Sequence, residues 1–447
     1  MAVILPHLIP FYIGGPCVET KQKQIYGIML FYSLSALLTA ILTGDVSETL
    51  QGFWTILSSP AQLTMDYFKL GTVGGTFLNV GMTGLSCIVV FALSRFAVNG
   101  LSLMSFFLTI GFSFFGMNFL NIWPCILGTW LFTRVAKLPF KSQVNIAIFA
   151  TSLSPFVSEG MWRHPAVEAP IARILFGVML GIICGFLRPI RAQHGPSLHK
   201  GYSLYNAASV AGFIGIMLFA FLFRATGFEI PTNTDIGDSQ ALVVNAFALA
   251  TSAVSVLAGF LLNGRSFKGF LHLLTRSSAY RCDFTNSYNV PVTMINIGMF
   301  GLFVTGYYNL IGAGMTGPTA GSIICLLAVT PCGTHIFNMI PMIVGYALAS
   351  SFCAFDLTTQ AIVVGLCFCA ALSPIPSRFG SLSGILAGLL HAVLVTSVVT
   401  FHGGFCLYNG GFTAGITAII LVPILEFFLE AKDTPSLLPT FKKLGQS

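Results

Sequence analysis

The sequence predicts an all-α polytopic membrane protein made of two inverted-topology repeats. Each repeat has about seven membrane segments, some of them re-entrant or broken. Three observations lead to this prediction: the composition, the recurrence of apolar runs, and stretches of sequence that occur twice. The chain has 447 residues, of which 55% are hydrophobic and 8% charged, whereas soluble domains typically carry about 25% charged residues. The chain therefore lacks the polar surface needed to face water on all sides.

Apolar runs separated by short polar loops recur along the whole chain, for example IYGIMLFYSLSALLTAILTG from Ile25. Runs of about twenty residues match the roughly 30 Å hydrocarbon core of a bilayer, whereas runs of about fifteen are at or below spanning length. The expected segments are 24–43, 72–94, 100–116, 118–133, 143–158, 170–187 and 203–223, followed by 241–263, 290–311, 316–332, 335–350, 360–374, 382–400 and 408–429.

Three stretches of the first half recur in the second half in the same order. HKGYSLYNAASVAG from His199 and HGGFCLYNGGFTAG from His402 share seven of fourteen residues. DYFKLGTVGGTFLNVGMTGL from Asp66 and DFTNSYNVPVTMINIGMFGL from Asp283 share eight of twenty, and GMNFLNIWPCILG matches GTHIFNMIPMIVG. Such self-similarity indicates a duplicated unit.

The duplication divides the chain into five parts. We expect an N-terminal interfacial segment (1–24), a first membrane repeat (25–223), an extracellular linker (224–240), a second membrane repeat (241–430) and a cytoplasmic tail (431–447).

An odd number of segments per repeat would make the second repeat enter the membrane from the opposite side. Loop 264–289 is basic, whereas its counterpart, loop 44–71, is mostly acidic. Because Lys and Arg concentrate in cytoplasmic loops, this contrast favours inversion. We predict a multi-pass protein of the cell membrane with both termini in the cytoplasm.

Several function classes have no support in the sequence. The net charge of +7 is explained by basic loops and predicts no nucleic-acid partner. Most of the eleven cysteines stand singly within apolar runs, where a thiol behaves as a small hydrophobe. We expect no metal site, no cofactor and no catalytic residues, because neither an H-E-x-x-H pattern nor a Ser/His/Asp arrangement is present.

The phrase around His199 and His402 supplies the first candidate site. Residues kept identical in two inverted repeats are candidates for a shared solute site near the axis that relates them. Asn206 and Asn409 offer uncharged donors and acceptors, and Tyr205 and Tyr408 add an aromatic face and a hydroxyl. The alternative is that the amides cap or pack membrane helices.

Two further pairs of residues recur at a spacing of 217. Asn79 and Asn296 precede glycines that would permit close backbone approach to a solute, or else only close helix packing. Asp66 and Asp283 are acids retained in both halves, and acids in membranes often mark ion pathways. Because both acids precede their apolar segments, they could instead lie at the membrane interface.

These repeated blocks resemble a bacterial membrane family known only as domain of unknown function 1576, whose members carry the domain twice. The resemblance extends over nearly the whole chain through Asn-Ile-Gly-Met-x-Gly-Leu, Asn-x-Ile-Pro-x-x-x-Gly and His-x-Gly-x-x-Leu-Tyr-Asn. It implies a two-copy architecture but no substrate.

Together these features favour a transporter or channel for a small polar solute, with lipid as the surrounding partner and a pathway between inverted repeats. The alternatives are a membrane sensor or scaffold, or an intramembrane enzyme. The sequence does not specify the substrate, the coupling ion or the oligomeric state.

Overall fold

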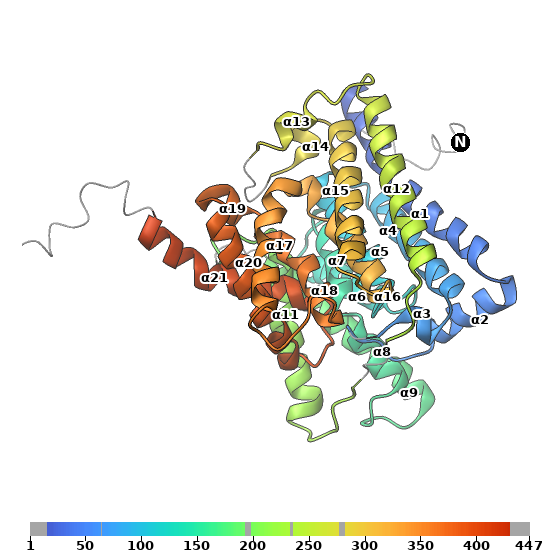
Figure 1. Ribbon diagram of the computed structural model, residues 1–447. Helices are drawn as coiled ribbons and strands as arrows, with labels where there is room; N and C mark the ends of the chain where they lie inside the picture. Colours follow the sequence, from blue (N-terminus) through green and yellow to red (C-terminus); the bar gives the residue numbers. More distant parts are fainter. Residues whose placement is uncertain (1–15, 64, 193–197, 233–235, 277–281, 430–447) are drawn as a thin grey trace, which may run out of the picture.

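The computed structural model describes residues 16–63, 65–192, 198–232, 236–276 and 282–429. This part of the chain is helical and contains no strand (Figure 1). Most of the expected N-terminal segment and all of the expected tail lie outside the described residues, and residues 16–24 begin the first helix.

The helices follow the expected segments closely. The first half contains α1 (Pro16–Thr43), α2 (Val46–Leu57), α3 (Tyr67–Leu70), α4 (Val73–Ser94), α5 (Gly100–Phe112), α6 (Ile122–Val135), α7 (Val144–Ala150), α8 (Pro155–Trp162), α9 (Pro170–Ala192) and α11 (Asn206–Phe219). The second half contains α12 (Ala241–Leu262), α13 (Phe270–Leu273), α14 (Phe284–Ser287), α15 (Val290–Leu310), α16 (Gly317–Leu327), α17 (Ile336–Ser350), α18 (Gln360–Cys369), α19 (Pro374–Phe379), α20 (Ser381–Val398) and α21 (Asn409–Leu429).

Eight of the described helices are long and apolar enough to cross a bilayer, and they indicate a multi-pass helical membrane protein. Four lie in each half: α1, α4, α9 and α11, the last extended to Arg224 by a π-helical turn, then α12, α15, α20 and α21. The other apolar helices are shorter.

The expected segments 143–158 and 360–374 are broken rather than continuous. A 3-10 turn separates α7 from α8, and another separates α18 from α19. In both cases the second helix starts at a proline, Pro155 or Pro374. Proline has no N–H to donate to the preceding turn, so it ends one helix and fits the first position of the next.

Both halves use the same close helix packing between their first two long helices, α1 with α4 and α12 with α15. A Cβ atom added to Gly84 would lie 2.4 Å from Ser33 Oγ, and one added to Gly301 would lie 2.2 Å from Ser252 Oγ. Glycine at both positions leaves room for these serine hydroxyls and so favours the close approach of the helices.

The pairs α6–α9 and α17–α20 repeat a second close packing. A Cβ on Gly185 of α9 would lie 1.9 Å from the Cys125 carbonyl oxygen, and a Cβ on Gly388 of α20 would lie 2.3 Å from the Met342 carbonyl oxygen. Gly185 and Gly388 are 203 residues apart, which is the spacing of the repeated phrase.

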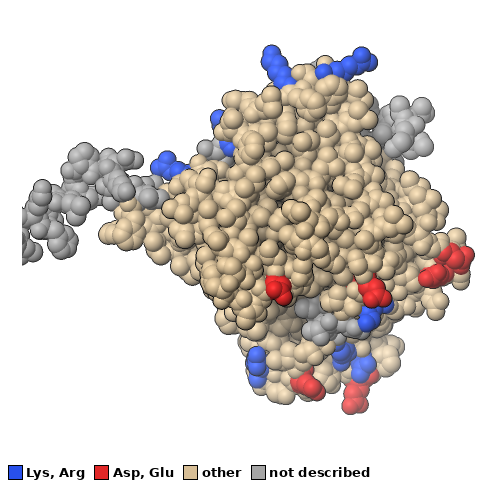
Figure 2. Space-filling model, in the orientation of Figure 1, with Lys and Arg blue, Asp and Glu red and all other residues tan. Residues whose placement is uncertain are grey.

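The ends of the molecule differ in charge. Figure 1 shows α13 and α14 at the upper end and α2 and α3 at the lower right. On the face seen in Figure 2, Lys and Arg without acidic neighbours stand at the upper edge, whereas acidic residues and further Lys and Arg lie together lower down, beyond a broad uncharged band.

Candidate functional site

The repeated phrase begins with a left-handed turn in both copies. Lys200 and Gly201 have φ of 50° and 82°, and their counterparts Gly403 and Gly404 have φ of 58° and 79°. Two successive residues with positive φ reverse the chain, and glycine adopts this conformation without the steric cost that a side chain adds. The glycine shared by the two phrases is thereby explained.

The histidine and leucine of the phrase hold its backbone. The Nδ1 atom of His199 accepts from the Ser203 N–H at 3.3 Å, and the Nδ1 atom of His402 accepts from the Cys406 N–H at 3.4 Å. Leu204 N–H donates to the Ala371 carbonyl of the second half at 2.9 Å, and Leu407 N–H donates to the Ser152 carbonyl of the first half at 3.0 Å. Each phrase is therefore anchored in the opposite half.

The tyrosines of the two phrases meet at the centre of the molecule. Their ring centroids are 6.2 Å apart, and both side chains are buried. Tyr205 donates to the Cys325 carbonyl at 3.3 Å. Phenylalanine rings surround the pair: Phe112, Phe149 and Phe368.

The helices that follow the tyrosines, α11 and α21, also touch through equivalent residues. A Cβ on Gly411 would lie 2.7 Å from the Cβ of Ala208, its counterpart 203 residues earlier. Ser209 approaches Gly415, and Gly212 approaches Phe412 in the same way. The predicted residues Tyr205, Tyr408, Asn206 and Asn409 thus belong to one region where the two halves meet.

The two asparagines differ in their hydrogen bonds. Asn409 donates to the Val395 carbonyl at 3.0 Å, and its Oδ1 lies 3.0 Å from His402 Nε2. In the first half, Asn206 Oδ1 and His199 Nε2 are buried, and neither has a hydrogen-bond partner within the described part of the chain. The histidine–asparagine bond is thus made in one copy only.

A cavity of about 270 Å³ reaches Asn409 and Gly410. It contains polar groups from Thr359 and Gln360 at the start of α18, and its remaining lining is mostly apolar. Gln360 is oriented by a bond of 2.7 Å from the Thr316 hydroxyl. The lining also includes part of the linker between the halves (Ile236) and Leu63.

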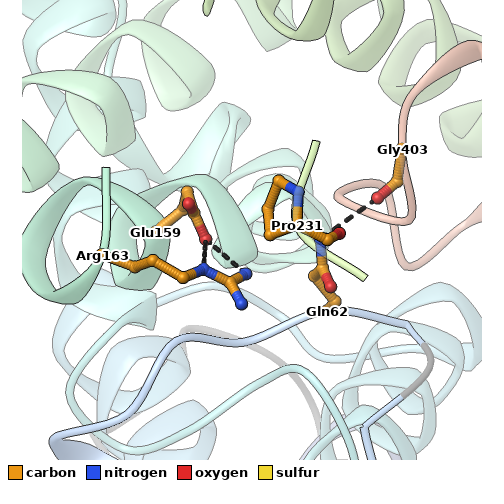
Figure 3. A network of polar contacts seen from close by, with 5 residues as sticks. All are labelled: Gln62, Glu159, Arg163, Pro231 and Gly403. Carbon is orange, nitrogen blue, oxygen red and sulfur yellow. Dashed lines mark hydrogen bonds and ion pairs between the residues drawn. The ribbon is translucent and has the colours of Figure 1, made fainter. Parts of the chain in front are cut away.

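A polar network holds the loops near this cavity together (Figure 3). Gln62 donates to the Pro231 carbonyl at 3.1 Å and to the Gly403 carbonyl at 3.3 Å, and so links the first half, the linker and the second phrase. Close by in Figure 3, Arg163 forms an ion pair with the buried Glu159. Glu159, on α8, is therefore paired within the protein.

The sequence reasoning missed a buried pair of basic residues, Arg188 on α9 and His391 on α20. They are 203 residues apart and hold equivalent positions: Arg188 Nη1 donates to the Ala207 carbonyl, and His391 Nε2 lies 2.9 Å from the Gly410 carbonyl. Arg188 follows directly on the expected segment 170–187, a position typical of a loop charge, but it is 2% exposed and therefore buried.

Asn79 on α4 and Asn296 on α15 each hold the turn that follows the next helix, α5 or α16. Asn79 donates to the carbonyls of Ser113 and Met117 at 2.8 and 3.0 Å, and Asn296 donates to those of Thr330 and Thr334 at 3.1 and 2.9 Å. Both residues are buried. Their side chains donate to carbonyls of the turns that follow α5 and α16.

Asp66 and Asp283 cap the short helices α3 and α14 and also reach the opposite half. Asp66 accepts from the Gly317 N–H at 3.1 Å, and Asp283 accepts from the Gly100 N–H at 3.4 Å. Because Gly100 and Gly317 are the first residues of α5 and α16, each acid lies at the positive end of a helix from the other half.

The two acids differ in their surroundings. Asp66 is buried and Asp283 is partly exposed. Burial raises the pKa of the Asp66 carboxyl above its ordinary value, while the N–H groups of Gly237, Phe68 and Gly317 stabilise the carboxylate and oppose this rise. No group of three or more His, Cys, Asp and Glu residues in the described ranges could hold a metal ion.

The family model described as "Protein of unknown function (DUF1576)" matches residues 46–224 and again 262–427. The chain belongs to this family. The first matched region begins just after α1 and the second at the last residue of α12, and both include one copy of the phrase. The comparisons with curated proteins and with solved structures returned no match.

Proposed function

We propose that this member of the DUF1576 family is a transporter or channel for a small polar solute, with its pathway at the interface of two inverted repeats. The observation that carries the proposal is the cavity that ends at Asn409 and Gly410. Its lining comes mainly from the second copy, joined by Leu63 of the first copy and Ile236 of the linker, and a few polar groups stand in an otherwise apolar wall. Its volume suits a small solute, since pockets for drug-sized ligands begin near roughly 300 Å³.

Reciprocal contacts support a two-fold relation between the copies. Asp66 contacts Gly317 as Asp283 contacts Gly100, and the phrases exchange their leucine bonds in the same way. Such an exchange of roles is expected when a two-fold axis relates the copies.

The direction of this axis is supported by the ends of the molecule. The counterparts α3 and α14 lie at opposite ends in Figure 1, which is expected if the axis lies in the membrane plane. The basic upper edge in Figure 2 then faces the cytoplasm. An inverted second copy needs an odd number of crossings per copy, and we assign α6 and α17 as the fifth crossings because they pack along the long helices α9 and α20.

The first test is solute flux in proteoliposomes containing the full-length protein. A panel of urea, small amides, amino acids, carboxylates and inorganic anions is offered with and without a pH gradient. We expect flux of at least one solute. In Asn206→Ala/Asn409→Ala the flux should fall by roughly tenfold or more, since a rise of only about 1.4 kcal/mol in the barrier to transport slows it tenfold.

The matched control is Asn245→Ala. Asn245 lies on α12 and bonds to Asn309 on α15, away from the phrase. This variant should retain wild-type flux. Absence of flux for the whole panel from folded protein, or equal flux in the double variant, would contradict the proposal and favour a sensor or scaffold.

A further inference from the structure

Arg188 carries a buried positive charge that no acidic side chain neutralises. It is 2% exposed, and it forms no ion pair with an acidic residue in the described ranges. Taking an arginine out of water costs several kcal/mol, a cost usually offset by a paired anion. A buried ionisable residue in a membrane protein is therefore a candidate functional site.

The hydrogen bonds of Arg188 leave part of its guanidinium group available. Nη1 donates to the Ala207 carbonyl, and Nη2 donates to the Phe149 carbonyl at 3.2 Å. Nε is buried and has no partner among the residues that the structure describes. Two neutral carbonyls orient the guanidinium but do not neutralise its charge.

The counterpart His391 is satisfied as a neutral ring. Its Nε2 can only donate to the Gly410 carbonyl, because a carbonyl oxygen has no proton to give. Its Nδ1 lies 2.6 Å from the Tyr346 hydroxyl. In the neutral tautomer with the proton on Nε2, Nδ1 accepts a hydrogen bond from that hydroxyl. Of the equivalent pair, only Arg188 carries a charge.

The start of α11, where Ala207 accepts from Arg188, contains further unpaired groups. The helix begins at Asn206, and the preceding residue, Tyr205, makes no side-chain capping bond. The buried atoms Asn206 Oδ1, Ser203 Oγ and Ser209 Oγ have no partner in the described part of the chain. An uncapped helix N-terminus favours negative charge, and an amide rotated about its last bond would present its NH₂ group instead of its oxygen.

We propose that Arg188 Nε and the first turn of α11 bind a small monovalent anion, a carboxylate or an inorganic anion of similar size. This inference rests on the proposed function and names the class of its solute. One guanidinium charge is neutralised by one negative charge, which favours a monovalent ligand. Because Arg188 is buried, the site is closed in this structure, and the anion enters when the phrase regions move apart.

The test measures binding by the full-length protein in detergent, through ligand-dependent thermal stabilisation at constant ionic strength. Formate, acetate, nitrate and chloride are titrated against bulky sulfonate buffer, and formamide and acetamide serve as neutral counterparts of the same shape. We expect saturable stabilisation by at least one of the anions and none by formamide or acetamide. Arg188→Gln should weaken binding roughly tenfold or more, since it removes charge-assisted hydrogen bonds.

Two further variants keep the outcome interpretable. Arg188→Lys retains the charge and should retain weakened binding, even if Arg188→Gln folds poorly. Arg134→Gln removes an exposed arginine that stacks on Trp130 and should bind as wild type does. Comparison of the carboxylates with the inorganic anions shows which of these two classes of anion the site binds more tightly.

The result separates this inference from the proposed function. Anion binding without flux would support the anion site and contradict transport. Flux of neutral solutes without anion binding would support transport and overturn the anion site. Equal binding by folded Arg188→Gln, or equal stabilisation by an acid anion and its amide, would also overturn it.

Discussion

Gly185→Ala and Gly388→Ala are both expected to destabilise the protein strongly. The added Cβ atoms would lie 1.9 Å from the Cys125 carbonyl oxygen and 2.3 Å from the Met342 carbonyl oxygen. Because the obstacle is backbone, a helix must shift, and overpacking of this kind costs about 1–3 kcal/mol or more. The apparent melting temperature in detergent should fall by roughly 1–3 °C or more in each variant.

Gly306→Ala is the matched control in α15. A Cβ at Gly306 would meet no described atom within 4 Å, and alanine favours a helix by up to about 1 kcal/mol over glycine. This variant should be as stable as wild type or slightly more stable. If Gly185→Ala and Gly388→Ala left stability unchanged, the matching close packing of α6–α9 and α17–α20 would be wrong.

A disulfide between the two copies is the second large effect that we expect. A Cβ placed on Gly415 would lie 3.8 Å from the Cβ of Ser209, and disulfides join Cβ atoms about 3.5–4.5 Å apart. The double variant Ser209→Cys/Gly415→Cys should therefore oxidise readily. The bond would join α11 to α21 at the centre and should abolish any flux that needs these helices to separate.

The bond can be detected on a gel after insertion of a protease site in the linker between the halves. Cleaved protein should run as one band without reductant and as two bands with it. The pair Ser209→Cys/Gly306→Cys serves as the control, because no described atom lies near Gly306. Two bands without reductant for the Ser209/Gly415 pair would contradict the contact between the phrases.

The helices were largely predictable because their apolar runs match spanning length. The expected segments 72–94 and 241–263 became α4 (Val73–Ser94) and α12 (Ala241–Leu262). The breaks at Pro155 and Pro374 were visible only as Ser-Pro bends, since the apolar runs continue across them. The repeated phrase also pointed to a region where the halves meet, because identity survives where both copies need the same turn.

The equivalence of Arg188 and His391 in the two copies could not be found by searching for identical residues. The two side chains differ in chemistry, and only their shared carbonyl contacts reveal that they are equivalent. Arg188 also stands near the end of an apolar run, where a sequence cannot distinguish a loop charge from a buried one. Likewise, the acids Asp66 and Asp283 are each bonded to a residue of the opposite half, a tertiary contact that no local pattern encodes.

If the two copies cross the membrane in opposite senses, cysteine labelling should find counterpart loops on opposite sides of it. Ser47→Cys in α2 and Lys268→Cys before α13 are exposed positions in counterpart loops. They are introduced singly into a chain whose Cys17, Cys282 and Cys353 are replaced by serine.

Intact cells are treated with a membrane-impermeant maleimide, and opened cells provide the total signal. We predict that the reagent labels Ser47→Cys from outside and that it labels Lys268→Cys only after the cells are opened. Labelling of both positions from the same side would contradict the inverted arrangement and, with it, the pathway between the two copies.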